Sequence, residues 1–308
     1  QQTTFPFEII LGEDESSDGT REICIQYAEK HPDLIKLFLR SRKDVIYINE
    51  NATGRFNMIE NLKAATGTFI AFCEGDDYWK DPLKLEKQVQ LLENNSSLIA
   101  CHHWQYIAIE KESSFVEVEA PTNGHGYFPQ AVANVKNIFA NQVRMKTRTV
   151  MFRNIIDNDF FPHWFYKVAF GDVPLSFLLG KHGDFGFIDE PMAVYRQTNS
   201  GISTTGLKEL GRKKFKVQHF KNWIQIWDYA NRFYDFKYHK EATETVLEFY
   251  KTITDNLPNT ARSFIKVLYY NIFERKLPFR RKISSSKWII LYYRKKLGYK
   301  LKRKLTPS

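Results

Sequence analysis

Hydrophobic residues in the first part of the chain fall into short runs, separated by polar turns and by helical patterns. The runs Phe7–Leu11 and Thr68–Cys73 predict buried strands, because each is short and apolar and is followed by turn-forming residues. Apolar residues at helical spacing predict helices over Arg55–Ala65 and Pro82–Asn94. Strands that alternate with helices in this way indicate an α/β fold.

The remaining pattern divides the chain in two. Either Leu34–Leu39 or Val45–Ile48 supplies one more strand, and later strands are predicted at Leu98–Trp104, Thr149–Arg153, Phe185–Ile188 and Met192–Arg196. Residues 105–145 show no clean period. From Gly206 onward the pattern changes to long, basic, aromatic-rich helices. We therefore predict an α/β domain over residues 1–205 and a basic helical region over residues 206–308.

Carboxylates gather where the strand Thr68–Cys73 ends. Glu74, Asp76 and Asp77 follow it, and Asp81-Pro82 begins the next helix with a capping residue and a proline. Adjacent carboxylates at the end of a buried strand are costly unless something pairs with them. Mg²⁺ or Mn²⁺ would do so, since hard cations prefer carboxylate oxygens and leave positions for phosphates. The pattern predicts a cation site at the sheet edge where open α/β folds bind ligands.

Two other acidic positions have both a functional and a structural interpretation. Asp14, at the end of a strand, is suited to accept hydrogen bonds from a nucleobase or a ribose; alternatively it caps the next helix with Ser16 and Asp18. Asp172 precedes the apolar helix Leu175–Leu179 and is either its N-cap or a buried carboxylate that faces the site.

Histidine and cysteine offer weaker signals. We expect His102 and His103 to be one core and one surface residue, with a metal-ligand pair as the alternative. The three cysteines are odd in number and lie in apolar stretches without metal-like spacing, so we expect reduced core residues in a cytosolic protein.

The net charge of +10 is unevenly distributed. From Arg275 to Ser308 there are 13 Lys or Arg and no Asp or Glu, so the remainder carries 32 basic and 35 acidic residues. This argues against nucleic-acid binding by the body and for an anionic partner at the C-terminus. Ser286–Leu305 interleaves aromatic and aliphatic residues with Lys and Arg, which is typical of an interfacial membrane helix; a solvated helix packed on the domain is the alternative. No apolar run is long enough to span a bilayer.

Several motifs, in this order along the chain, resemble glycosyltransferase family 2. They are FEIILGEDESSDGT from Phe7, Gly54 with Asn57, ATGTFIA from Ala65, EGDDYW from Glu74 with its continuation KDPLKLEKQ, Gly171-Asp172, and AVYR from Ala193. The EGDDYW continuation is similar to that of a bacterial subgroup, and the resemblance covers about residues 1–205.

The resemblance implies a GT-A fold with a mostly parallel sheet, inverting transfer from a nucleotide-diphosphate sugar, and Mg²⁺ or Mn²⁺. Carried over by position, Asp14 would contact the base of the nucleotide, and Asp172 would be the catalytic base. Asp77, with Asp76 beside it, would hold the metal and the sugar. Glu13, Asp18 and Asn57 would complete the nucleotide-sugar site. The acceptor would be a saccharide or lipid-linked saccharide in bacterial surface polysaccharide synthesis, at the cytoplasmic face of the membrane.

The chain departs from the family pattern in three places. The family begins with a strand that precedes Phe7–Leu11, so we expect the sheet here to lack an interior strand. Glu13 replaces the usual first Asp, which keeps the charge. Thr198 stands where many relatives have His.

The chemistry agrees with a transferase. A nucleoside diphosphate leaving group needs charge neutralisation rather than an acid, so one carboxylate base suffices. A hydrolase would need two opposed carboxylates, which Asp76/Asp77 and Asp172 do not exclude by sequence alone. A non-catalytic nucleotide-sugar or glycan-binding module with the same fold is the main alternative. A nucleotidyltransferase is less favoured because a GxxxxGK phosphate loop is absent.

Overall fold

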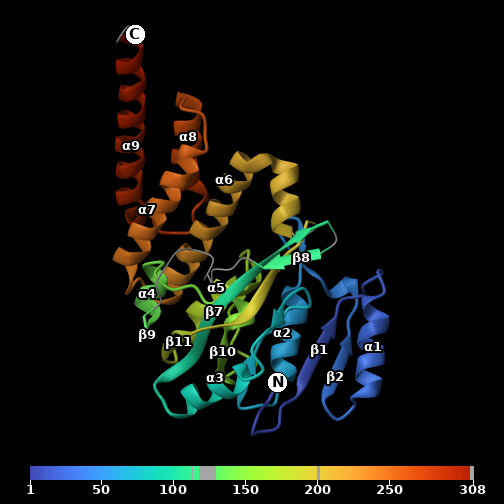
Figure 1. The fold of residues 1–308 in the computed structure, drawn as a ribbon. Helices are drawn as coiled ribbons and strands as arrows, with labels where there is room; N and C mark the ends of the chain where they lie inside the picture. Colours follow the sequence, from blue (N-terminus) through green and yellow to red (C-terminus); the bar gives the residue numbers. More distant parts are fainter. Residues whose placement is uncertain (113, 118–129, 200–201, 306–308) are drawn as a thin grey trace. The chain divides into compact units, whose positions relative to one another are not determined.

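The computed structural model describes residues 1–112, 114–117, 130–199 and 202–305, with residues 202–205 and 297–305 described as backbone only (Figure 1). The chain forms two compact units. Unit 1 comprises residues 1–135 and 143–197, and unit 2 comprises residues 136–142 and 198–308.

Unit 1 begins with a small parallel layer. Strand β1 (Ile9–Glu13) pairs with β2 (Ile35–Leu39) from Ile9↔Ile35 to Glu13↔Leu39, and helix α1 (Thr20–Lys30) connects them (Figure 1). No residue of α1 is buried. A short turn of 3₁₀-helix, η1 (Arg42–Asp44), leads to the hairpin of β3 (Ile46–Ile48) and β4 (Asn51–Thr53), so both predicted alternatives for a strand here are formed.

Helix α2 (Arg55–Ala64) leads from this layer to a second, larger sheet, which has the strand order β5-β10-β7-β11-β6. Its strands are β5 (Phe69–Ala71), β6 (Tyr78–Trp79), β7 (Leu98–Lys111), β10 (Met151–Arg153) and β11 (Asp184–Gln197), with β8 (Ser114–Glu117) beside β7 and β9 (Val132–Ala133) beside β11. Among the described strands, β1 pairs with β2 alone, so the two sheets are separate.

The larger sheet is mixed, which corrects the prediction of a mostly parallel sheet. Among its described strands, only β7 and β11 pair in parallel, whereas β10 runs antiparallel to both β5 and β7, and β6 runs antiparallel to β11. Hydrophobic pattern identifies a buried strand but carries no information on its direction, which the connecting segments set.

Strand lengths also differ from the pattern. β7 continues to Lys111, into a stretch without a clean period, because it pairs with β11 as far as Ile109 and with β8 from Ala108 to Lys111. The two predicted strands Phe185–Ile188 and Met192–Arg196 form one strand, β11, with register shifts around Pro191. Proline lacks a donor for the ladder, so a bulge at this point interrupts the pattern without ending the strand.

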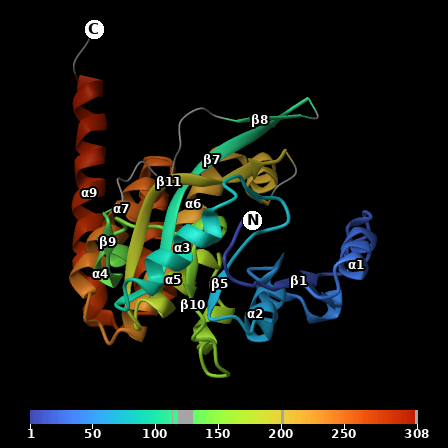
Figure 2. The same cartoon turned by 60° about the horizontal axis from the view of Figure 1, so that its bottom comes forward.

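The core of unit 1 lies on both sides of β7. Helix α3 (Lys84–Glu93) packs on β7, β10 and β11 (Figure 2), where its residues Leu85, Val89 and Leu92 meet Leu98, Cys101 and Met151. Helix α5 (Asp172–Leu179) is buried from Val173 to its last residue.

Unit 2 is helical. Its long helices are α6 (Ile202–Phe233), α7 (His239–Asp255), α8 (Ala261–Tyr269), continued by the π-helical turn η4 (Tyr270–Glu274), and α9 (Phe279–Leu305). α6 contains a break at Gly211, where φ is 71°. The buried Arg275 donates two hydrogen bonds to Asp228, at 2.9 and 2.6 Å, which joins the start of the last segment to α6. The short helix α4 (Val135–Phe139) adds the Phe139 carbonyl, which accepts from Trp227 and Thr245.

The C-terminal segment Ser286–Leu305 is helical as predicted and forms most of α9. Ile289 and Tyr293 are buried on one side of it, while Ile290 and Leu291 are exposed. Within the described residues, none of the helices combines the length and apolar character that crossing a bilayer requires.

Candidate active site

The acidic segment forms a tight turn between two strands. β5 ends at Ala71, and the amide of Asp77 donates to the Glu74 carbonyl at 3.0 Å. β6 follows at once and pairs with Ala193 and Val194 of β11. The predicted carboxylates are therefore held between the end of β5 and the end of β11.

Asp77 is the buried member of this group. Its side chain is 1% exposed, and both of its oxygens have protein partners. Oδ1 accepts from the Arg196 backbone amide at 3.0 Å, and Oδ2 accepts from Nε of Arg148. In this arrangement Asp77 forms a buried ion pair with Arg148, and both of its carboxylate oxygens accept a hydrogen bond. Asp77 thereby joins β11 to the segment before β10.

Arg148 is the residue at this site that sequence reasoning missed. It lies on the 3₁₀ turn η2 (Thr147–Thr149), and its guanidinium also donates to Gln105 at 2.8 Å and to Glu74 at 3.4 Å. Its Cζ lies 4.3 Å from the centre of the Tyr195 ring. The basic run before β10 was the only signal in the sequence, and it gave no indication of which basic side chain turns inward.

Asp76 and Glu74 are both exposed at the turn, but Glu74 accepts from Thr147 and Arg148, whereas none of the described residues bonds to the Asp76 side chain. The Arg196 guanidinium donates to the carbonyls of Gly75 and Asp76, so it holds the backbone of the turn and leaves this carboxylate outward. Burial of the Glu74 carboxyl group, together with the charge of Asp77, raises the pKa of Glu74, although the hydrogen bond from Thr147 and the charge of Arg148 lower it.

The carboxylates of the acidic turn fit a hard divalent cation whose coordination shell a bound ligand completes. Within the described residues, no three His, Cys, Asp or Glu side chains are arranged as a metal cage. Mg²⁺ and Mn²⁺ sites, however, commonly use one or two carboxylates together with substrate phosphates and water. Asp76 offers an outward carboxylate of this kind, with Asp77 next to it.

Asp172 is the first residue of α5. Its Oδ1 accepts from the Val173 amide at 2.9 Å, and Oδ2 lies 3.9 Å from Nζ of Lys146. The side chain is 22% exposed, at a small cavity that Thr147 also lines. Because Thr147 donates to Glu74 at 2.5 Å, the segment 146–148 connects Asp172 with the acidic turn. The structure thus connects Asp172 with Glu74 and Asp77 of the acidic turn through one segment of the chain.

A buried arginine holds the backbone in front of Asp172. Arg55 of α2 donates to the carbonyls of Phe165 and Val168, at 2.9 and 3.0 Å, and to that of Phe170, and it stacks on the Phe165 ring. Phe170 has a φ of 61°, which is unfavourable for an aromatic residue and needs such support. Burial lowers the pKa of Arg55 to about 10, and the nearby charge of Asp172 opposes this shift.

The predicted nucleotide-binding residues lie at the end of β1, and two of them have local structural partners. Glu13 is buried and accepts from the amides of Glu15 and Ser16, and Arg21 pairs with it at 3.1 Å. Asp18 accepts from the Thr20 amide at 3.1 Å beside the start of α1, although the N-cap of this helix is Gly19.

Asp14 and Asn57 differ from these two residues. Among the described residues, none donates a hydrogen bond to the Asp14 carboxylate, and burial raises the pKa of Asp14 despite the charge of Arg40. Asn57 donates to the Gly12 carbonyl at 2.9 Å, which leaves its Oδ1 buried and unpaired.

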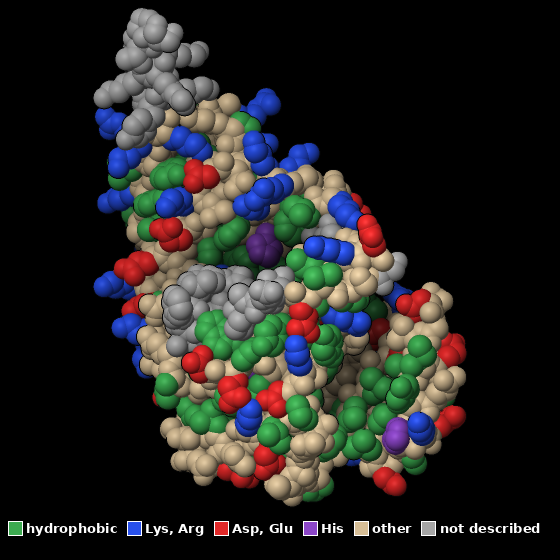
Figure 3. Space-filling view, viewed as in Figure 1, with side chains coloured by type: hydrophobic (Ala, Val, Ile, Leu, Met, Phe, Trp, Pro, Cys, Tyr) green, Lys and Arg blue, Asp and Glu red, His purple; other side chains and the backbone are tan. Residues whose placement is uncertain are grey.

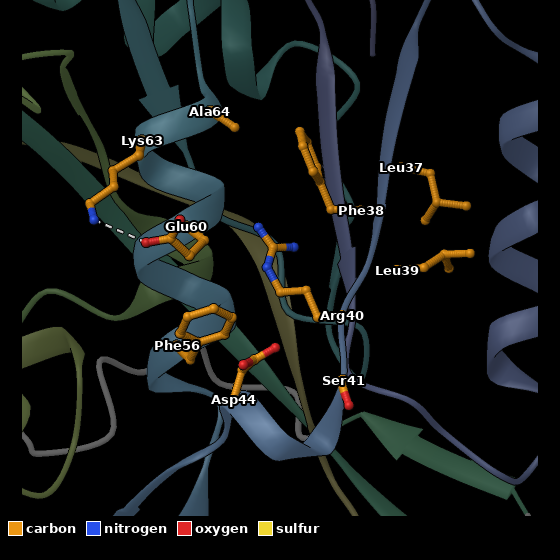
Figure 4. Close-up of a pocket in the computed structure, with 10 residues that line it drawn as sticks. All are labelled: Leu37, Phe38, Leu39, Arg40, Ser41, Asp44, Phe56, Glu60, Lys63 and Ala64. Carbon is orange, nitrogen blue, oxygen red and sulfur yellow. Dashed lines mark hydrogen bonds and ion pairs between the residues drawn. The ribbon is translucent and has the colours of Figure 1, made fainter.

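Three unpaired polar atoms surround Gly12. Nη1 of Arg40 and the Oδ1 atoms of Asn57 and Asn61 are buried without partners, and a Cβ at Gly12 would lie 2.7, 1.9 and 2.5 Å from them. Buried polar atoms are normally satisfied, so this cluster is suited to bind water or a polar ligand group. Arg40, the residue after β2, points toward α2, into a hollow lined by Phe56 and Glu60 (Figure 4).

The histidines and cysteines differ in burial from what the sequence predicts. His102 and His103 are both buried, so the predicted surface histidine is wrong. β7 continues as a central strand at this point, which places both of its faces under cover. Burial lowers the pKa of His102 to about 4. All three cysteines are free, and Cys73 is exposed rather than part of the core.

Comparison with known proteins supports the motif series. Residues 1–129 match the family model described as Glycosyl transferase family 2. This part of the chain is therefore similar to glycosyltransferase family 2 in the region where the first motifs of the series lie. With the α/β architecture of unit 1 and the helices that follow, the match confirms the predicted fold class, a GT-A-type fold with a helical C-terminal region.

Relatives of this chain include proteins of several bacteria. An uncharacterized protein of Mycobacterium tuberculosis is 29% identical over 227 residues, which cover 70% of this chain and 56% of that protein. TuaG of Bacillus subtilis, whose name assigns it provisionally as a teichuronic acid biosynthesis glycosyltransferase, is 34% identical over 90 residues, 29% of this chain and 32% of TuaG. The chain therefore spans little more than half the length of the mycobacterial relative.

A solved structure gives a weaker likeness. The mannosyltransferase PcManGT from Pyrobaculum calidifontis, in complex with GDP-Man and Mn²⁺, aligns with 94% of this chain and 78% of its own at 15% identity, with a TM-score of 0.48.

Proposed function

We propose that this protein is an inverting glycosyltransferase that moves a sugar from a nucleotide-diphosphate donor to an acceptor hydroxyl. The observation that carries the proposal is the link between two carboxylates. Asp76 is exposed at the acidic turn and Asp172 stands at the start of α5. Residues 146–148 contact Asp172 and the neighbours of Asp76 in that turn, Glu74 and Asp77. This is the separation of roles that an inverting transferase needs: one carboxylate for the cation and diphosphate, another for the acceptor.

In the proposed reaction, Asp172 takes the proton from the acceptor hydroxyl while that oxygen attacks the anomeric carbon. The bond from that carbon to the donor's diphosphate oxygen breaks, and the nucleoside diphosphate leaves with the bonding electrons. A Mg²⁺ or Mn²⁺ ion held by Asp76 or Asp77 would neutralise charge on the leaving diphosphate. Arg55 keeps Asp172 in place through the carbonyls of residues 165–170.

The nucleotide end of the donor is assigned to the cluster near Gly12. Asp14 and Oδ1 of Asn57 are acceptors suited to base or ribose donors, and Arg40 supplies an unpaired donor. Glu13 and Asp18 would act on the nucleotide indirectly, because their carboxylates already organise the loop after β1. The name of TuaG supports an acceptor in surface polysaccharide synthesis, either a saccharide or a lipid-linked saccharide. The basic C-terminus would bring the enzyme to the anionic inner face of the bacterial membrane.

A thermal-shift screen of UDP-, GDP- and dTDP-sugars with and without Mn²⁺ tests donor binding. We expect one nucleotide class to raise the melting temperature, more strongly with Mn²⁺, and Asp76→Asn to remove the Mn²⁺-dependent part. Asp159→Asn, an exposed carboxylate elsewhere in unit 1, is the matched control. If no nucleotide sugar stabilises the protein, the proposal fails.

A second candidate is a non-catalytic nucleotide-sugar-binding module. The ion pair of Asp77 with Arg148 favours it, because both oxygens of the predicted metal ligand are engaged by the protein. Release of nucleoside diphosphate from the donor found in the screen separates the two candidates. Release that Asp172→Asn lowers by about 10²-fold or more supports the transferase. Binding without release supports the module.

A further inference from the structure

Helix α8 and the turn η4 present apolar side chains to solvent along one stripe of unit 2. Ile265, Tyr269 and Phe273 are 62, 54 and 67% exposed, and they follow one another at four-residue intervals on one side of the helix. The rings of Tyr269 and Phe273 lie 4.8 Å apart, so the stripe is continuous there. We call these three residues the α8 stripe.

The α8 stripe is not needed to hold α8 in place. Ser263, Val267 and Tyr270 on the opposite side are buried, and Tyr270 donates through its hydroxyl to the Lys221 carbonyl at 3.2 Å. The Thr260 side chain caps the helix by accepting from the Ser263 amide at 3.2 Å. The outward apolar residues therefore form a surface additional to the packed core, and a contiguous apolar surface of this kind marks an interaction site.

Basic side chains accompany the stripe. Arg262, Lys266, Lys276 and Arg280 are exposed in the same stretch, and Phe279 at the start of α9 is 66% exposed among them. From Arg262 to Ser308 the chain has 15 Lys or Arg and one acidic residue, Glu274, which lies 3.9 Å from Lys221. Lys and Arg side chains spread over the α8–α9 end of the face shown in Figure 3.

We infer that the α8 stripe, with its basic neighbours, binds the surface of an anionic lipid bilayer. An apolar stripe inserts at the level of the headgroups while adjacent Lys and Arg side chains pair with anionic lipids. A second copy of the chain fits less well, because a symmetric contact would place this strongly basic surface against itself.

The inference rests on the proposed function only in that a lipid-linked acceptor would lie at such a surface. It also differs from attachment through the last helix alone, since it assigns the apolar contact to α8 and η4.

The inference is tested by co-sedimentation of the 308-residue chain with phosphatidylcholine vesicles. The vesicles are used with and without about 30% phosphatidylglycerol, which gives an anionic surface. We expect binding to the anionic vesicles only, weakened by salt. The triple variant Ile265→Ser/Tyr269→Ser/Phe273→Ser should bind at least about tenfold more weakly. Its matched control is Ile23→Ser/Tyr27→Ser, which removes side chains of similar exposure (55 and 57%) from α1 and should bind like the wild type.

The charge term is tested separately with Lys266→Glu/Lys276→Glu, which should also bind about tenfold more weakly or worse to anionic vesicles. Wild-type binding by the triple variant would overturn the inference. It would also be overturned if only removal of residues 297–308, and none of the substitutions, abolished vesicle binding. A wild-type dimer in light scattering that the triple variant converts to monomer would identify a second copy as the partner and overturn it too. The nucleotide-sugar thermal shift should be unchanged in the triple variant, so failure here is distinguishable from failure of the proposed function.

Discussion

The two halves of the candidate site lie in two parts of unit 1, and these parts differ in how much apolar surface they bury. The layer of β1, α1 and β2 offers Asp14 and the cluster near Gly12, yet none of the residues of α1 is buried, and Ile23 and Tyr27 are exposed. The larger sheet offers Asp76, Asp77 and Asp172, and α5 is buried along nearly its whole length. We conclude that the acidic turn is built on a packed core, whereas the nucleotide end lies on a layer with little apolar burial of its own, where local opening is easier.

The contrast is tested most directly by removing one apolar side chain from each part. Phe177→Ala in α5 should lower the free energy of unfolding by about 3–5 kcal/mol, because the ring is fully buried and leaves a cavity. Ile23→Ala in α1 should change it by less than about 0.5 kcal/mol, because the side chain is more than half exposed. Urea unfolding of both variants measures this, and equal losses would contradict the contrast.

The two parts also hold different ion pairs. Arg148→Met should lower the free energy of unfolding by about 3 kcal/mol, because it leaves the buried Asp77 carboxylate with only the Arg196 amide. Arg21→Met, the matched change at Glu13, should cost about 1 kcal/mol, since two backbone amides still bond to that carboxylate. Arg148→Met/Asp77→Leu should recover much of the loss. If the double variant is no more stable than Arg148→Met, an uncompensated charge is not the cause.

His102, one of the two buried histidines of β7, predicts a pH dependence specific to the larger sheet. The pKa of His102 is lowered from 6.5 to about 4 in the folded state, so its contribution to stability is complete above pH 6.5 and is lost as the pH falls toward 4. Relative to His102→Leu, the wild type should lose about 3 kcal/mol over that range. Urea titrations at pH 7.5, 5.5 and 4 measure it. His31→Leu, at an exposed position beside α1, should retain the wild-type profile.

The smallest expected effect is local and concerns the backbone before Asp172. Arg55→Lys should raise hydrogen exchange in residues 163–173 by about tenfold, because one ammonium cannot bond three carbonyls in the geometry of a guanidinium. Arg153→Lys is the matched control, since Arg153 also binds backbone carbonyls in unit 1, those of Leu92, Asn95 and Leu98. Unchanged exchange in Arg55→Lys, or the same increase in the control, would remove Arg55 as a positioning residue for Asp172.

Sequence reasoning found the elements better than their arrangement. The apolar runs at Phe7–Leu11 and Thr68–Cys73 and the helical spacing over Arg55–Ala65 correspond to β1, β5 and α2, because period and length carry this information locally. The direction of β10 and the union of two predicted strands in β11 depend on partners distant in the chain, and no local pattern contains them. One histidine of the pair His102 and His103 was misplaced for the same reason, since burial on a central strand is a property of the sheet.

The site divides in the same way. The residues of Asp76-Asp77 and of Gly171-Asp172, and the family whose model matches residues 1–129, follow from the order of residue types along the chain. Tertiary structure alone decided which carboxylate of the pair is buried, because that depends on Arg148 and Arg196 arriving from two other segments. It also decided that Arg40, Asn57 and Asn61 converge at Gly12, and that α8 turns Ile265, Tyr269 and Phe273 outward. Residue type sets the chemistry a position offers, whereas contacts between distant segments set the partner it meets and the solvent it sees.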